Sequence, residues 1–130
     1  MKNHYTPKPT LGTLHHVAIA VDNLAEAVEY YQNILELEAL ATPQEVVAQG
    51  IRWFALDEGR ALHLVEVAGV SAPPRAHIAL RVEDNAAWRA YLENKGVSLI
   101  EPTVALYAAK RFFVQDPSGN LIELVEWLTD

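Results

Sequence analysis

The sequence predicts an α+β fold made of two tandem βαβββ modules, and three observations lead to this prediction. Residues 16–21 and 77–82 both open with a histidine and then alternate large apolar residues with other residues. These two stretches start 61 positions apart, and the tripeptide Leu-Val-Glu likewise occurs twice, at residues 64–66 and 124–126. Alternation is typical of a strand with one buried face, and self-similarity at a nearly fixed spacing indicates a duplicated unit.

Composition narrows the class of protein and its partners. The chain has 130 residues, of which 51% are hydrophobic, so it matches one globular domain, and no apolar run approaches the ~20 residues of a membrane span. The formal net charge of −7, with no basic cluster larger than the pair Lys110-Arg111, disfavours nucleic acid. Because the chain has no cysteine, any metal ion must be held by His, Asp or Glu.

Residues 1–10 are polar and contain Pro7 and Pro9. We interpret them as a flexible N-terminal arm rather than a secretory signal, because they lack its apolar segment. The expected location of the protein is therefore the cytoplasm.

The first module, residues 11–68, is expected to begin with a strand over residues 14–21. Asn23 with Glu26 three positions later resembles a capping box, and the helix after it is expected to end near Leu35. Its apolar stripe has helical spacing and consists of Leu24, Val28, Tyr31 and Leu35. Three extended segments follow, over residues 37–48, 51–56 and 61–67.

Residues 69–74 form a Pro-containing linker, and the same order then restarts in the second module, residues 75–130. Its first strand is predicted over residues 76–82, and its helix runs from a cap at Asp84 or Asn85 to a stop at Lys95-Gly96. Three further strands are predicted over residues 97–101, 107–114 and 120–127. Both modules together form a single domain, residues 11–130.

Four candidate metal ligands fall on equivalent positions of the two modules. Alignment of the last strands places His63 opposite Glu123, just as His16 stands opposite His77. A pseudo-two-fold pairing of the modules could bring these side chains together as a site of three imidazoles and one carboxylate. An ionised glutamate among apolar neighbours is costly unless a cation compensates it, which favours Glu123 as a ligand.

The chain resembles the vicinal oxygen chelate superfamily, which includes glyoxalase I, methylmalonyl-CoA epimerase, fosfomycin-resistance proteins, extradiol dioxygenases and bleomycin-binding proteins. The matching segments are residues 14–24, 30–35, 77–82 and 116–124. The last of these reads Asp-Pro-Ser-Gly-Asn-Leu-Ile-Glu-Leu and is quite specific for the superfamily. The resemblance implies a cupped mixed β-sheet with a helix packed outside each module, and commonly a homodimer whose cup is completed within one chain or across two.

The resemblance also implies one divalent metal ion, Zn, Ni, Co, Mn or Fe, held by residues of the first and last strands of each module, here His16, His63, His77 and Glu123. At His63 the chain departs from the family, because glyoxalases of this size usually have Glu there and the epimerase has Gln. The implied reaction is that of a metal-dependent lyase or isomerase on a small substrate with vicinal oxygens, in which Glu123 or His63 moves a proton.

Two other functions stay open. Without His63 as a ligand, two histidines and Glu123 form a facial triad that suits Fe(II), as in a dioxygenase of the extradiol type. The third function is that of an antibiotic-binding or resistance protein, although retention of the ligand set favours catalysis.

Four further residues are candidate substrate contacts. Arg81 shares the strand face of His77 and could pair with a substrate carboxylate or with a protein carboxylate. Arg111 could contact an anionic group or lie in a solvated basic pair with Lys110. Trp53 and Phe113 are expected in the wall of the cup or in the core, together with Tyr107.

Overall fold

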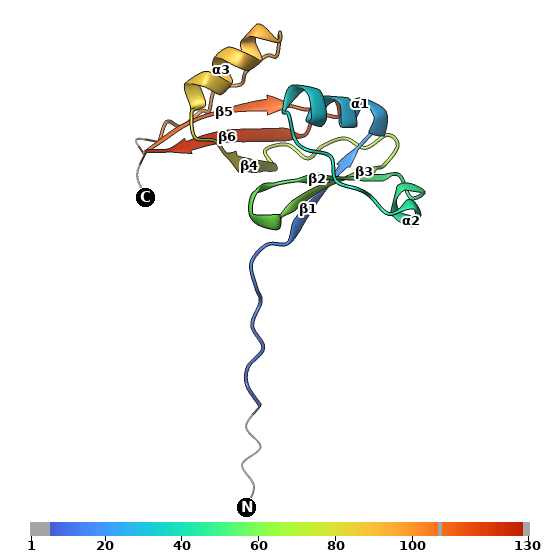
Figure 1. Ribbon diagram of the computed structural model, residues 1–130. Coiled ribbons are helices and arrows are strands. Elements are labelled where there is room, and N and C mark those ends of the chain that lie inside the picture. The colour runs from blue at the N-terminus through green and yellow to red at the C-terminus, as the bar shows by residue number, and fades with distance from the viewer. Residues whose placement is uncertain (1–5, 107, 129–130) are drawn as a thin grey trace, which may run out of the picture.

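The computed structural model describes residues 6–106 and 108–128, which contain two mixed three-stranded sheets (Figure 1). The first sheet has the order β1 (His16–Val21), β3 (Ala61–Glu66), β2 (Ile51–Ala55). The second has the order β4 (His77–Arg81), β6 (Leu121–Trp127), β5 (Ala109–Gln115). In both sheets the last strand of the module lies in the middle, parallel to the first strand and antiparallel to the remaining one. The predicted α+β fold of two modules is therefore confirmed.

The predicted helix caps are also confirmed. Helix α1 (Leu24–Glu29) starts where Asn23 Oδ1 accepts a hydrogen bond of 3.0 Å from the backbone N–H of Glu26, and it continues as a π-helical segment, η1 (Tyr30–Ile34). Helix α3 (Asn85–Asn94) starts with the equivalent bond from Ala87 to the side chain of Asp84. It stops before Gly96, whose φ of +79° suits a residue without a Cβ.

Two predicted strands are wrong, those over residues 37–48 and 97–101. Each segment meets its sheet at one isolated bridge, Ala39 with Phe54 and Ile100 with Phe113. Pro43, in the middle of the first segment, and Pro102, directly after the second, have no N–H to donate to a neighbouring strand. The chain instead forms the short helix α2 (Gln44–Val47) directly after Pro43.

Several predictions fall partly outside the described residues. Residues 1–5 of the predicted arm and Tyr107 lie outside them, as do residues 129–130. Residues 6–10 form no helix or strand and extend from the body of the molecule (Figure 1).

A short 3-10 turn, η2 (Asp57–Gly59), joins β2 to β3. In the described part of the chain, no helix has the length and apolarity needed to cross a membrane.

The two sheets share one hydrophobic core on the faces that carry the helices. Residues from both modules contribute to it, among them Val21, Tyr31, Phe54, Leu62, Leu64, Leu92, Phe112, Val114, Ile122 and Leu124. The strand faces follow the predicted alternation, so that Val17 and Ile19 pack against the core while His16 and Ala18 are exposed. The opposite, open face of each sheet is therefore available to a ligand or to a second chain.

The repeated Leu-Val-Glu tripeptide has a structural role in both modules. The carboxylate of Glu66 accepts a hydrogen bond of 2.9 Å from the backbone N–H of Leu24, at the start of α1. The carboxylate of Glu126 accepts the equivalent bond, also 2.9 Å, from Asn85 at the start of α3. Each glutamate thus fixes the first turn of a helix to the end of the central strand, where a negative charge also favours the helix dipole.

The turn before β6 connects the second module to the first. Its buried Asp116 accepts a 2.8 Å hydrogen bond from the Tyr31 hydroxyl and further bonds from the backbone N–H groups of Ser118 and Asn120. Asn120 in turn donates through its amide to the carbonyl of Ala20 in β1. Burial, together with the charge of Asp116, raises the pKa of the Tyr31 phenol far above its usual value, so that the hydroxyl stays a donor.

Candidate metal centre

The four predicted ligands occupy equivalent places in the two sheets. In the first sheet Ala18 of β1 pairs with His63 of β3, and in the second sheet Ala79 of β4 pairs with Glu123 of β6. All four side chains lie on the open faces, because they alternate with the residues of the core. The alignment of the last strands made from the sequence is therefore the alignment found in the sheets.

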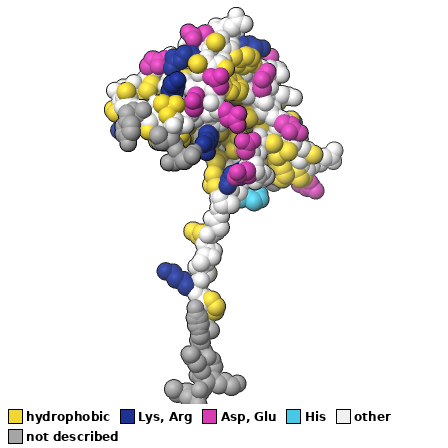
Figure 2. All heavy atoms as spheres, turned by 60° about the vertical axis from the view of Figure 1, so that its left-hand side comes forward, with side chains coloured by type: hydrophobic (Ala, Val, Ile, Leu, Met, Phe, Trp, Pro, Cys, Tyr) yellow, Lys and Arg dark blue, Asp and Glu magenta, His cyan; other side chains and the backbone are white. Residues whose placement is uncertain are grey.

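In the first module, His63 lies between two aromatic rings. Its imidazole stacks on that of His16 with ring centroids 4.1 Å apart, and on the indole of Trp53 at 4.7 Å. His15 Nδ1 lies 2.9 Å from His16 Nδ1, so one of the two rings donates to the other. Histidine side chains reach the surface near the base of the extended arm (Figure 2).

The environment of His63 favours the neutral form of its imidazole. Burial lowers the pKa of His63 below the ordinary 6.5, and the charges that His16 and His15 would carry lower it further. A neutral imidazole has a free lone pair, which is the form that binds a metal ion or accepts a proton.

Protonation of His63 is therefore expected to destabilise the fold. A group whose pKa is lower in the folded state contributes stability above its unfolded pKa, and this contribution is lost as the pH falls through the folded pKa. Between about pH 7.5 and about pH 5.5, the Tm of wild-type protein in chelator should fall more than that of His63→Phe, which keeps an aromatic ring beside Trp53. Thermal unfolding followed by circular dichroism measures this difference, and equal slopes would contradict it.

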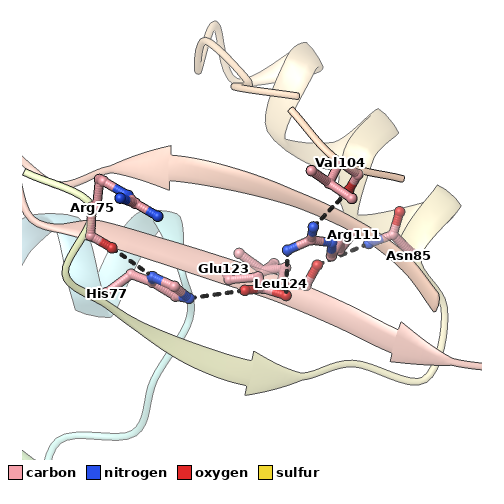
Figure 3. Close-up of polar contacts among 7 residues, drawn as sticks. All are labelled: Arg75, His77, Asn85, Val104, Arg111, Glu123 and Leu124. Carbon is pink, nitrogen blue, oxygen red and sulfur yellow. Dashed lines mark hydrogen bonds and ion pairs between the residues drawn. The ribbon is translucent and has the colours of Figure 1, made fainter. Parts of the chain in front are cut away.

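In the second module, the imidazole of His77 and the carboxylate of Glu123 face each other, with a proton or a metal ion needed between them (Figure 3). The backbone carbonyl of Arg75 can only accept, so His77 Nδ1, 2.9 Å away, must donate to it. In a neutral imidazole the other nitrogen, Nε2, then carries a lone pair, yet it lies 3.1 Å from Glu123 Oε1. A proton or a metal ion relieves the repulsion between these atoms, and a backbone carbonyl behind the ring is typical of metal-binding histidines. The pair fits a divalent ion.

Arg111 and Phe113 of β5 lie beside this pair. Arg111 Nη1 is 3.6 Å from Glu123 Oε2, while Nη2 donates to the carbonyl of Val104 at 2.7 Å (Figure 3). The guanidinium also lies 5.8 Å from the centroid of the Phe113 ring, which meets His77 edge-on at 5.1 Å. Both residues therefore line the open face beside Glu123, as does Trp53 beside His63.

Within one chain the predicted ligands form two pairs rather than one cluster. Over residues 6–106 and 108–128, no group of three or more His, Cys, Asp or Glu side chains is placed to hold a metal ion. The reason is that the two sheets share a core through their helix-bearing faces, which leaves each open face with its own pair of ligands.

Sequence reasoning missed two groups that orient the second pair, the carbonyls of Arg75 and Val104. Every residue has a backbone carbonyl, so no pattern of residue types could have indicated these two.

A cavity of about 650 Å³ lies between the modules, on their apolar side. Its lining includes Leu35, Leu56 and Trp88, and Arg81 also borders it. None of the four predicted ligands lines this cavity, although Ala79, which pairs with Glu123, does.

Comparisons with known proteins show the family and the fold. The family model described as Glyoxalase/Bleomycin resistance protein/Dioxygenase superfamily matches residues 13–124. A glyoxalase family protein from Bacillus anthracis is 26% identical and has a TM-score of 0.84, over 93% of this chain and 99% of that one. A glyoxalase/dioxygenase from Nostoc punctiforme is 20% identical with a TM-score of 0.75, over 94% of this chain and 99% of that one. Lactoylglutathione lyase from Agrobacterium tumefaciens is 19% identical with a TM-score of 0.71, over 92% and 96%. The last two similarities concern the fold alone.

Proposed function

Because this chain belongs to the Glyoxalase/Bleomycin resistance protein/Dioxygenase superfamily, we propose that it is a metal-dependent, glyoxalase-like lyase or isomerase. Its substrate would be a small molecule with two vicinal oxygens. The observation that carries the proposal is the contact of 3.1 Å between His77 Nε2 and Glu123 Oε1, which needs either a proton or a metal ion between the two atoms. The superfamily includes a lactoylglutathione lyase, whose fold this chain shares over most of its length.

We further propose that a second copy of the chain completes the site, so that His16 and His63 of one protomer meet His77 and Glu123 of the other. One observation supports this arrangement. The two pairs lie on the open faces, and within one chain neither pair is joined by a third possible ligand among the described residues.

In this proposal each residue of the site has a definite role. A bound divalent ion supplies Lewis-acid stabilisation of negative charge on the substrate oxygens. The carboxylate of Glu123 or the neutral imidazole of His63 accepts the proton that the substrate loses and returns it to the product. Trp53 restricts the ring of His63 by stacking, and Phe113 does the same for His77 from its edge.

A second function, an Fe(II) dioxygenase of the extradiol type, is favoured by the orientation of His63. Its ring is within 17° of parallel to that of His16, so the nitrogen lone pairs of the two rings do not converge on a common point. If Trp53 keeps His63 in this orientation, the ligands are His16, His77 and Glu123. Two histidines and one carboxylate are the ligand set of many Fe(II) oxygenases.

Metal analysis of wild-type protein and His63→Ala, both purified without chelator or affinity-tag metal, distinguishes these functions. We expect about one ion of Zn²⁺, Ni²⁺, Co²⁺ or Mn²⁺ per chain in the wild type and loss of the ion in His63→Ala. Iron that survives the substitution would favour the dioxygenase and lead to oxygen-consumption assays. If neither protein binds metal after reconstitution, the proposed enzyme is wrong and the binding or resistance protein takes its place.

A further inference from the structure

Three rows of paired residues cross the open face of each sheet. In the first sheet the rows, written from the first strand to the third, are His16–Ala61–Ala55, Ala18–His63–Trp53 and Ala20–Val65–Ile51. In the second sheet they are His77–Leu121–Gln115, Ala79–Glu123–Phe113 and Arg81–Val125–Arg111. Because every position in one sheet has a counterpart in the other, the two faces can be compared residue by residue.

The first two rows have similar chemistry in both modules, whereas the third rows differ. A histidine begins the first row of each sheet, and the second row holds the other predicted ligand with an aromatic residue beside it. The third row of the first sheet, Ala20–Val65–Ile51, is entirely apolar, and we call it the apolar row. The third row of the second sheet, the arginine row, places Arg81 and Arg111 on either side of Val125.

The arginine row carries more positive charge than the single carboxylate on this face neutralises. Its two guanidiniums share this face with one carboxylate, that of Glu123, among the nine positions of the three rows. Arg81 is exposed, and Arg111 Nε is buried with no hydrogen-bond acceptor among the described residues. This local excess contrasts with the net charge of −7 of the whole chain and with the many acidic side chains on the face shown in Figure 2.

The two rows would lie on opposite sides of a shared metal site. We consider a pairing of the open faces in which β1 of one protomer runs antiparallel to β4 of the other. Each third row is two residues beyond the central ligand, or about 7 Å along the strand. The apolar and arginine rows would therefore be separated by roughly 13 Å, with the metal ligands between them.

We propose that the substrate is a small organic anion, with an oxyanion group such as a carboxylate held by Arg81 and Arg111 and an apolar group held by Ala20, Val65 and Ile51. This inference rests on the proposed function, since it uses the shared site. Arg111 already reaches to within 3.6 Å of Glu123, so the oxyanion would lie next to the reacting oxygens. Guanidinium groups bind carboxylates and phosphonates through two parallel hydrogen bonds, so both chemistries are candidates.

Isothermal titration calorimetry on metal-loaded protein tests the inference without an activity assay. Benzoylformate has a carboxylate, vicinal oxygens and an apolar ring, whereas its methyl ester is neutral and also a weaker metal ligand. The contribution of the arginines is therefore the change of the acid-to-ester preference when an arginine is replaced. We expect the acid to bind at least about tenfold more tightly than the ester, the equivalent of one charge-assisted hydrogen bond. Pyruvate, which lacks the ring, should bind about tenfold more weakly than benzoylformate. Titration with phenylphosphonate shows whether a phosphonate serves as well as a carboxylate.

The variants Arg111→Met and Arg81→Met should each reduce the acid-to-ester preference, and Arg52→Met is the matched control. Arg52 lies on β2 and pairs with Leu64, which faces the core. The substitution Arg52→Met therefore removes one positive charge from the face opposite the open face. Arg81→Met keeps the test valid if loss of the half-buried Arg111 prevents folding.

Equal binding of acid and ester by metal-loaded wild type, or an unchanged preference in Arg81→Met, would overturn the inference and leave the proposed function intact. Equal binding of pyruvate and benzoylformate would overturn the role of the apolar row. Metal content, measured on every sample, reports separately on the proposed function, because its failure appears as protein that holds no metal.

Discussion

Glu123→Gln is expected to lose metal binding while the chain stays folded. The substitution removes the carboxylate charge of the proposed ligand set but keeps the shape of the side chain. Its amide can donate to His77 Nε2, now 3.1 Å from the carboxylate, and so satisfies this pair without any cation. Metal affinity should fall by more than about 100-fold, the upper end of what loss of an outer-shell partner costs. Elemental analysis after dialysis, with circular dichroism on the same sample, measures both properties.

Glu126→Gln is the matched control for this experiment. Glu126 lies three residues further along β6, where it binds the backbone N–H of Asn85 on the helix side of the sheet. The amide oxygen of glutamine can still accept that hydrogen bond, so the variant should keep its metal. Wild-type metal content in Glu123→Gln and in His77→Ala would refute the proposed centre.

Asp116→Ala is expected to destabilise the protein by about 3 kcal/mol or more. Asp116 is buried, and its removal leaves the Tyr31 hydroxyl and the N–H groups of Ser118 and Asn120 without their acceptor. A buried donor left without a partner costs about 1–3 kcal/mol. Urea unfolding at one fixed protein concentration gives the difference, provided that the m-value is unchanged.

Two further variants make the result for Asp116 specific. Tyr31→Phe removes one of these hydrogen bonds and should cost about 1 kcal/mol. Asp57→Ala, at an exposed position in η2, should change the free energy of unfolding by less than about 0.5 kcal/mol. If Asp116→Ala unfolds at the same urea concentration as the wild type, water replaces the lost acceptor and the turn does not hold the modules together.

The sequence was sufficient for the elements whose pattern has a single structural interpretation. The alternation after His16 and His77 set which residues face the core, and the repeat aligned His63 with Glu123. The segments 37–48 and 97–101 were misjudged because a run of apolar residues is compatible with an extended chain that pairs at one bridge only.

The arrangement of the two sheets could not be derived in the same way. Alternation shows that one face of each strand is buried, but it does not show which sheet buries it, so convergence of the ligands was left undecided. The carbonyl of Arg75 that orients His77 is likewise invisible in a sequence. For these reasons the sequence indicated candidate residues for the site but not that they occur as two pairs.

The central strand of each module carries its helix-binding glutamate on one face and its candidate metal ligand on the other. Glu66 and Glu126 anchor helices on one side, while His63 and Glu123 lie on the other. A substitution on the open face therefore leaves the anchor of the helix unchanged. After duplication, this separation would let the residues of the two open faces diverge, as those of the apolar and arginine rows have done, while both halves retained the architecture of the ancestral unit.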